Sequence, residues 1–308
     1  MPIHDVGYRS WSGPLGSWRS RWTVIAGMGI RMIWRSHWVR RMLLLAWLPA
    51  ASMGLAFFLY EQALKHPDTT AVLLMLLKWL PHSGPALQMW ASAPLESRHA
   101  VWSLFLITFF RYPQGTLMVL VVGIIAPPLV ARDFRSRAFL LFFSRPLTPL
   151  EYILGKSVVL WCYLAAITTL PALIIYVLGV LLSPDISVVA YTWDLPLRIL
   201  LASFVLIVPT SALALCFSSM TTEIRYAGFA WFTMWVMGWV AYVYLQKIGA
   251  SHQWSMISLY HMLGRVQEWV FGLSTNPTDV SAAATLLAVV TCGSYVIILS
   301  RIYAPMRI

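Results

Sequence analysis

Long apolar runs, separated by short polar and basic stretches, occupy most of this 308-residue chain. A helix that crosses a membrane needs about 20 mostly apolar residues, because the hydrocarbon layer is about 30 Å thick. Six runs meet this requirement and predict spans over residues 42–60, 112–131, 157–182, 197–217, 227–245 and 280–300. The pattern therefore predicts an all-α polytopic membrane protein, with one transmembrane domain over 42–308 and a separate segment over 1–41.

Two further apolar runs, at 71–80 and 101–110, are about half as long as a span. We expect them to be helices that lie at the membrane surface or dip partway into it. Trp79, Trp90 and Trp102 would then lie at the level of the lipid headgroups. If both runs crossed instead, the number of spans would rise by two and the termini would stay on the same side.

The segment before the first span mixes arginine with apolar residues. Within residues 18–38, apolar side chains recur at helical spacing, and the arginines lie largely off that stripe. The stripe consists of Trp22, Ile25, Met28 or Gly29, and Met32. It predicts an amphipathic helix in the inner membrane interface; the alternative is an irregular anchoring tail.

The distribution of Lys and Arg predicts the orientation. Six spans divide the loops into two sets, and the set that includes both termini holds fifteen of the 22 Lys and Arg residues. Because cytoplasmic loops are enriched in these residues, both termini are expected in the cytoplasm. The formal net charge of +11 is then a topology signal, and no nucleic-acid partner is expected.

Catalytic and metal-binding patterns are missing from the sequence. There is no GxSxG or HExxH motif and no CxxC pair, and the predicted spans are essentially free of ionisable residues. We therefore expect no enzyme activity, bound cofactor or metal on this chain, and no ion-coupled transport. Four of the six spans contain proline, which predicts kinks near Pro49, Pro127, Pro171 and Pro209.

The loop over residues 132–156 is unusual in two respects. Its first half has three arginines followed by the apolar run Phe139 to Phe143, which must lie on the membrane, pack under the domain or dock into a partner. Its second half predicts a helix start, with Thr148 as N-cap, Pro149 at the first position and Glu151 completing a capping box.

The letters GKS at Gly155 to Ser157 imitate the end of a nucleotide-binding P-loop. A P-loop needs a glycine where Leu150 stands, and it needs free backbone amides. A helix that begins at Pro149 already uses those amides. We therefore exclude nucleotide binding here and expect Lys156 to extend its charge toward the membrane surface at the start of the third span.

The stretch "IIAPPLVARDFRSRAFLLFFSRPLTPLEYILGKSVV", Ile124 to Val159, resembles the region around the first cytoplasmic loop of ABC type-2 permeases. The residues that match that family's pattern are Asp133, Arg145, Pro146, Tyr152, Gly155 and Lys156. More weakly, "CFSSMTTEIRYAGF" resembles the family's second cytoplasmic turn, and "YRSWSGP" resembles the start of a bacterial subgroup. Pro149 is a departure, since the family often has a basic residue there.

The resemblance implies a type V exporter-like permease fold in the bacterial inner membrane. It also implies a second permease subunit and a separate ABC ATPase, which would bind ATP and Mg and contact a coupling helix, here 132–146. The contact residues would be Arg132, Asp133, Arg135, Arg137, Phe139, Phe142, Phe143, Arg145, Pro146 and Glu151, with Thr222, Glu223 and Arg225 in a second contact. Glu151 has the alternative of serving only as a cap.

Three functions remain open from the sequence. The chain could pass a substrate through the membrane, transmit force to an extracytoplasmic accessory protein without translocating anything, or act as an enzyme or scaffold without an ATPase. Membrane lipid is a partner in each case. The uncharged, hydroxyl-bearing spans do not select a substrate.

Overall fold

The computed structural model describes residues 21–81, 83–93, 97–138, 147–184, 186–249, 256–273 and 276–303. Within these ranges all regular structure is helical, as predicted. The first half contains α1 (Arg21–Trp34), α2 (His37–Leu45), α3 (Leu48–Lys65), η2 (Pro67–Thr69), α4 (Thr70–Trp79), α5 (Ser83–Ser92), α6 (Arg98–Arg111), α7 (Pro113–Ile125) and α8 (Pro127–Arg135). The second half contains α10 (Pro149–Ile167), α11 (Thr169–Leu182), α12 (Val188–Thr192), α13 (Leu195–Met220), α14 (Ile224–Lys247), α15 (Leu259–Val270) and α16 (Pro277–Tyr303).

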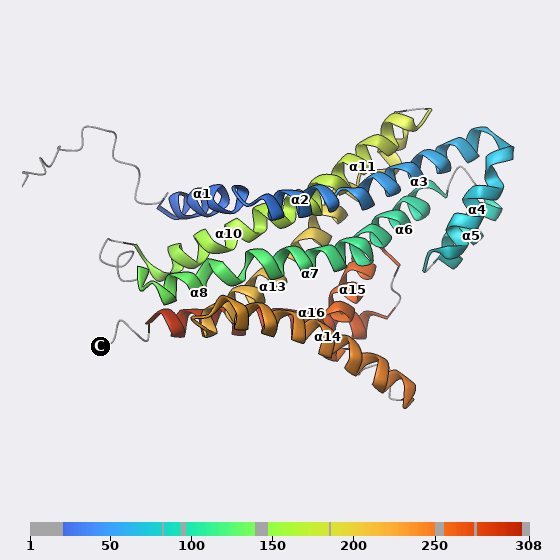
Figure 1. Cartoon of the computed structure of the whole chain (residues 1–308). Helices are drawn as coiled ribbons and strands as arrows, with labels where there is room; N and C mark the ends of the chain where they lie inside the picture. Colours follow the sequence, from blue (N-terminus) through green and yellow to red (C-terminus); the bar gives the residue numbers. More distant parts are fainter. Residues whose placement is uncertain are drawn as a thin grey trace, which may run out of the picture.

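The helices form an elongated bundle with two distinct ends (Figure 1). At one end α1 begins, α8 ends, α10 begins and α16 ends; we call it the loop end, because it also holds the turn between α13 and α14. The opposite end, called the far end, carries α4 and α5 at its tip, with α6 and α15 beside them.

Six helical stretches are long and apolar enough to cross a membrane, which indicates a multi-pass membrane protein. In the part of the chain that the structure describes, they are His37–Lys65, Arg98–Arg135, Pro149–Leu182, Val188–Met220, Ile224–Lys247 and Pro277–Tyr303. Each contains one predicted span, so the six apolar helices are confirmed. All six extend beyond their predicted bounds, and several therefore include charged residues.

The prediction of a surface helix over 101–110 is wrong. Every residue from Val101 to Phe110 is buried. Trp102 packs edge-on against Tyr176, with ring centroids 6.0 Å apart, and therefore does not lie at the protein surface. After one turn residue α6 continues into α7, so that 38 residues from Arg98 to Arg135 form one apolar stretch, about 57 Å long at 1.5 Å per residue.

The tip formed by α4 and α5 mixes exposed and buried aromatic residues. Trp79 is 80% exposed, whereas Trp90 is buried and packs against Tyr60 with a centroid distance of 5.5 Å. The exposure of Trp79 is compatible with the predicted contact with lipid headgroups, whereas Trp90 and Trp102 are shielded by protein.

Proline kinks were predicted in four spans, and three of these spans are interrupted near the proline. Helix breaks occur between α2 and α3 near Pro49, between α7 and α8 at Pro127, and between α10 and α11 near Pro171. At the second break the Ser218 hydroxyl accepts from the amides of Val130 and Ala131 and donates to the Pro127 carbonyl. Such a hydroxyl satisfies backbone groups that a proline break leaves open. Pro209, in contrast, lies inside a continuous α13.

Helix α1 packs along the beginning of α10. A Cβ on Gly155 would lie 2.9 Å from Ile25 Cβ, and a Cβ on Gly29 would overlap Val159 Cγ2. These two glycines allow the helices to approach closely. Within the predicted stripe Met28 and Met32 are exposed, and the residues of α1 that are buried in the protein are Ala26 and Ile33.

Candidate functional site

The loop end holds the two loops for which contacts were predicted, but only part of the first loop is described. Five predicted contact residues lie outside the described residues: Phe139, Phe142, Phe143, Arg145 and Pro146. The others belong to the end of α8, the start of α10 and the turn between α13 and α14.

The expected single coupling helix over 132–146 is wrong. Helix α8 ends at Arg135, and Arg137 has a φ of 53°, in the left-handed region that interrupts a right-handed helix. Arg132 and Arg135 occupy the last turn of α8, where cations favour the helix dipole. The helix that carries Arg132 and Arg135 is thus interrupted before residues 139–146, which lie outside the described residues.

Asp133 joins the end of α8 to the start of α10. Its carboxylate accepts a hydrogen bond from the Tyr152 hydroxyl at 2.7 Å and pairs with Lys156 Nζ at 2.6 Å. Lys156 Nζ also lies 5.4 Å from the Tyr152 ring centroid. We call Asp133, Tyr152 and Lys156 the Asp133 clamp.

The clamp is largely shielded from solvent. The side chains of Lys156 and Asp133 are 12% and 17% exposed, and Tyr152 is 2% exposed. Charge-assisted hydrogen bonds are stronger than neutral ones, and partial burial reduces their screening. The expectation that Lys156 extends toward the membrane surface is therefore wrong, because this side chain turns inward to Asp133.

The start of α10 is built as predicted. The Thr148 hydroxyl accepts from the Glu151 amide at 3.3 Å, and the Glu151 carboxylate accepts from the Thr148 amide at 2.8 Å, which completes the capping box. Gly155 and Lys156 lie within the helix that starts at Pro149. Their backbone therefore forms no phosphate-binding loop, and Gly155 serves instead as the close-packing position for α1.

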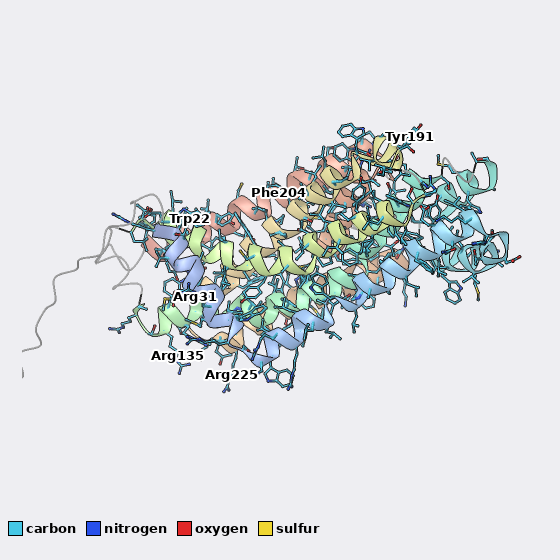
Figure 2. The ribbon with its side chains drawn as sticks, turned by 90° about the horizontal axis from the view of Figure 1, so that it is seen from above. Trp22, Arg31, Arg135, Tyr191, Phe204 and Arg225 are labelled. Atoms are coloured by element: carbon cyan, nitrogen blue, oxygen red, sulfur yellow. The ribbon has the colours of Figure 1, made fainter. Side chains whose placement is uncertain are left out.

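The second predicted contact lies beside the first. Arg135 Nη1 pairs with Glu223 at 3.2 Å, with side chains 63% and 44% exposed. Thr222 and Arg225 are also exposed, and Figure 2 shows Arg135 and Arg225 near each other at this end. The two loops thus share one accessible, basic surface.

The loop end is suited to transmitting a mechanical displacement. The Asp133 clamp ties the first loop's two helices together, Ser218 ties α8 to α13, and Arg135 ties α8 to the start of α14. A load on the first loop would therefore act on α8, α10 and α13 as a unit. No group of three or more His, Cys, Asp or Glu side chains among the described residues could hold a metal ion.

Three members of this arrangement were not selected as site residues from the sequence. Tyr152 and Lys156 matched the family pattern but were not proposed as contacts, and Ser218 carried no signal beyond its place in a serine pair.

Comparison with known proteins does not identify a family for this chain. No protein-family model matches the chain, and no curated protein matches it significantly.

Proposed function

We propose that this chain is the transmembrane permease subunit of an ATP-driven ABC transporter, an exporter of the bacterial inner membrane with both termini in the cytoplasm. The observation that carries the proposal is the Asp133 clamp. The resemblance to ABC type-2 permeases selects Asp133, Tyr152 and Lys156 by sequence pattern alone, and these three side chains meet in space.

In this proposal the chain itself performs no catalysis. ATP and Mg bind to a separate ABC ATPase, which contacts the loop end, and a second permease subunit completes the membrane part. Closure of the ATPase displaces the first loop. Because the clamp joins α8 to α10, the displacement reaches both helices together and is not absorbed by bending of the loop.

The basic surface of the loop end is the proposed contact for the ATPase. Its arginines would meet acidic residues, while Phe139, Phe142 and Phe143 would enter an apolar groove on the ATPase. Glu151 is committed to the capping box and is left out of the contact.

A second candidate is a subunit that transmits force to an extracytoplasmic accessory protein without moving a substrate. The construction of the far end favours this alternative. Ion pairs there join α3 to α6, α6 to α15, and α15 to α16, and His99 on α6 is hydrogen-bonded to Asp194, the N-cap residue of α13. An end fastened in this way could carry a displacement outward as one body.

Co-purification tests the proposed function. The tagged chain is purified from its native membrane, and ABC ATPase in the eluate is quantified by mass spectrometry and ATP hydrolysis. Phe142→Asp combined with Arg145→Asp should abolish both signals while the chain stays in the membrane. Asp133→Asn should retain the ATPase but reduce the stimulation of ATP hydrolysis by the complex.

A matched control is Lys78→Gln together with Lys247→Gln, which removes two exposed cations away from the proposed contact and should change co-purification little. If wild-type eluates contain no ABC ATPase, or if the Phe142 and Arg145 variant retains it, the proposal is wrong. ATP-dependent uptake into inverted vesicles then separates transport from force transmission, since only transport accumulates a substrate.

A further inference from the structure

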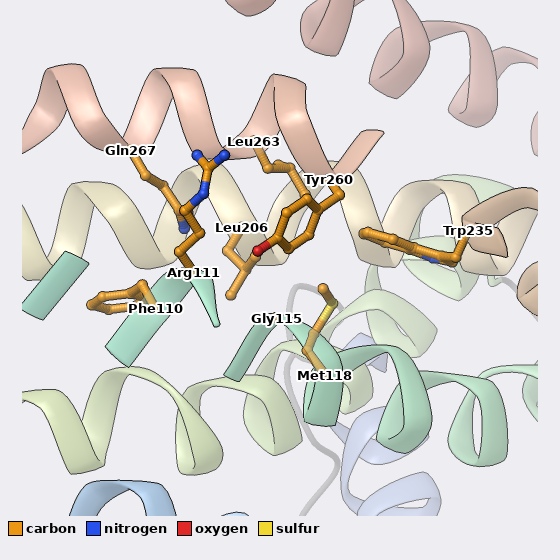
Figure 3. A pocket seen from close by; sticks show the side chains of 9 residues that line it. All are labelled: Phe110, Arg111, Gly115, Met118, Leu206, Trp235, Tyr260, Leu263 and Gln267. Carbon is orange, nitrogen blue, oxygen red and sulfur yellow. The ribbon is translucent and has the colours of Figure 1, made fainter. Parts of the chain in front are cut away.

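Five helices enclose a small internal cavity toward the far end of the bundle (Figure 3). Its walls come from α6, α7, α13, α14 and α15, and its volume is about 10 Å³, room for one water-sized group. Most of the lining is apolar or aromatic, and the polar members include Arg111, Tyr260 and Gln267. The lining combines an apolar wall with a few convergent polar groups, as ligand sites do, but the free space admits only a group the size of a water molecule.

Arg111 crosses this cavity to reach α15. Its Nη1 donates to the Glu268 carboxylate, and its guanidinium carbon lies 5.4 Å from the centroid of the Tyr260 ring. A Cβ on Gly264 would overlap Arg111 Nη1. The lack of a side chain at Gly264 therefore lets the guanidinium rest against the backbone of α15.

The cation is not fully satisfied by this pair. Arg111 Nε is buried without a hydrogen-bond partner, and so is Trp235 Nε1 on the opposite wall. Both are donors, so the cavity walls present two buried N–H groups without acceptors. A buried donor without a partner costs about 1–3 kcal/mol, which a ligand with an acceptor group would recover.

Among the described basic side chains around the cavity, Arg111 is the cation that faces it. Arg265 points to Asp279 on α16 at 3.4 Å. Burial, reinforced by Arg111 and Arg265, lowers the pKa of His261 to about 4, so this imidazole is neutral at pH 7. Among the described residues, Glu268 is the anion in contact with Arg111.

We propose that Arg111 binds the anionic group of an amphiphilic cargo, and that Glu268 occupies the place of that group while the site is empty. The exchange replaces one carboxylate by another, so it needs little more room than Glu268 leaves. The side chain of Glu268 is 14% exposed and can turn toward solvent. The apolar walls at Phe110, Met118 and Leu206 would receive the first carbons of the chain.

The assignment of this cavity as a cargo site rests on the proposed transport function. Its position supports that assignment, because Arg111 lies within the apolar stretch Arg98–Arg135. A charge buried in a membrane is costly and usually serves a substrate path. The competing explanation is a purely structural ion pair that fastens α15 to α6.

Photolabelling tests the site on the purified chain in phosphatidylcholine nanodiscs, without any ATPase. The probe is dodecanoate with a diazirine near its middle, and labelled peptides are identified by mass spectrometry. Wild-type protein should be labelled on α7, α13 or α15 beside the cavity. Excess dodecanoate should compete, whereas dodecylamine should not.

Two substitutions distinguish a binding site from a structural pair. Glu268→Gln removes the internal competitor, so labelling should rise about 3-fold or more. Arg111→Gln should lower labelling about 10-fold, and Lys247→Gln, which removes an exposed cation from the same end, should leave it unchanged. The double variant Arg111→Gln/Glu268→Gln buries no unpaired charge, so it should fold and remain unlabelled.

The proposal is overturned if dodecylamine competes as well as dodecanoate, or if the folded double variant is labelled like wild type. A decrease in labelling with Glu268→Gln would assign the pair to structure alone. These results are independent of ATPase co-purification, so failure of the cargo site and failure of the proposed function can be told apart.

Discussion

The two ends of the bundle use charged residues in opposite ways. At the loop end Arg135 and Glu223 are 63% and 44% exposed, and Arg31, Arg35 and Arg225 are also exposed. At the far end Glu61 is 2% exposed and accepts from Arg98 at 3.2 Å, and Arg111 pairs with Glu268 inside the bundle. Charge at the loop end is accessible to a partner protein, whereas charge at the far end is paired between helices, so a ligand there would have to displace a carboxylate.

This difference indicates at which end the ion pairs can be exchanged for contacts with another protein. A buried pair is costly to break, because the remaining partner stays in a poorly solvated place. An exposed pair contributes little to stability and can be exchanged for contacts with another protein. The Asp133 clamp is intermediate, since it lies at the loop end but is shielded like the far-end pairs.

The largest effect is expected from Arg98→Met at the far end. This change leaves the buried Glu61 without the cation that it is hydrogen-bonded to, and breaking such a pair costs about 3–5 kcal/mol. The midpoint of thermal unfolding in detergent should fall strongly. The matched change Arg135→Met at the loop end should cost less than about 1 kcal/mol. Equal effects of the two substitutions would remove the distinction between the ends.

The second effect concerns the clamp. Lys156→Met leaves the half-buried Asp133 with the Tyr152 hydroxyl alone, and we expect a loss of about 2 kcal/mol, in the range of hydrogen bonds to charged groups. A double-mutant cycle with Asp133→Asn, followed by thermal unfolding, isolates the pair. Its coupling energy should exceed that of Arg135 and Glu223. A smaller value would place the clamp among ordinary surface pairs.

Local patterns predicted much of the fold, and long-range pairing explains the rest. The capping box of Thr148 and Glu151 was predictable because its members are three residues apart. The burial of 101–110 was not, since counting apolar runs separately treats Arg111 as the end of a segment. Once Arg111 pairs with Glu268, 157 positions away, two short runs can join into one stretch of 38 residues.

The candidate site was predicted less completely than the fold. Composition and spacing placed basic and apolar residues in the first loop, but Lys156 was assigned to the membrane surface. Its partner Asp133 lies on a different helix, and no periodicity connects the two positions. Only the resemblance placed both residues in one pattern, without indicating that they touch.

A smaller effect is expected where α1 meets α10 at the loop end. Gly155→Ala would place a Cβ 3.0 Å from the Trp22 carbonyl oxygen, so α1 must shift, at a cost of about 1–2 kcal/mol. Gly27→Ala on the outer face of α1 meets nothing within 4 Å and should stabilise the helix by up to about 1 kcal/mol. Thermal unfolding of both variants measures the two shifts in unfolding midpoint. If both shifts had the same sign, the predicted contrast would be wrong.

The smallest effect is a pH dependence at the far end. Burial, with Arg111 and Arg265 nearby, lowers the pKa of His261 from 6.5 to about 4, and its ring stacks on Tyr242 at a centroid distance of 3.5 Å. Between these two pH values the unfolded chain binds a proton that the folded protein does not, so stability is complete above pH 6.5 and falls as the pH approaches 4. Partial exposure of the ring reduces the size of the effect. His261→Phe should flatten the change in unfolding midpoint between pH 7 and pH 5, whereas the exposed His37→Phe should leave it as in wild type; an unchanged slope in His261→Phe would show that other groups cause it.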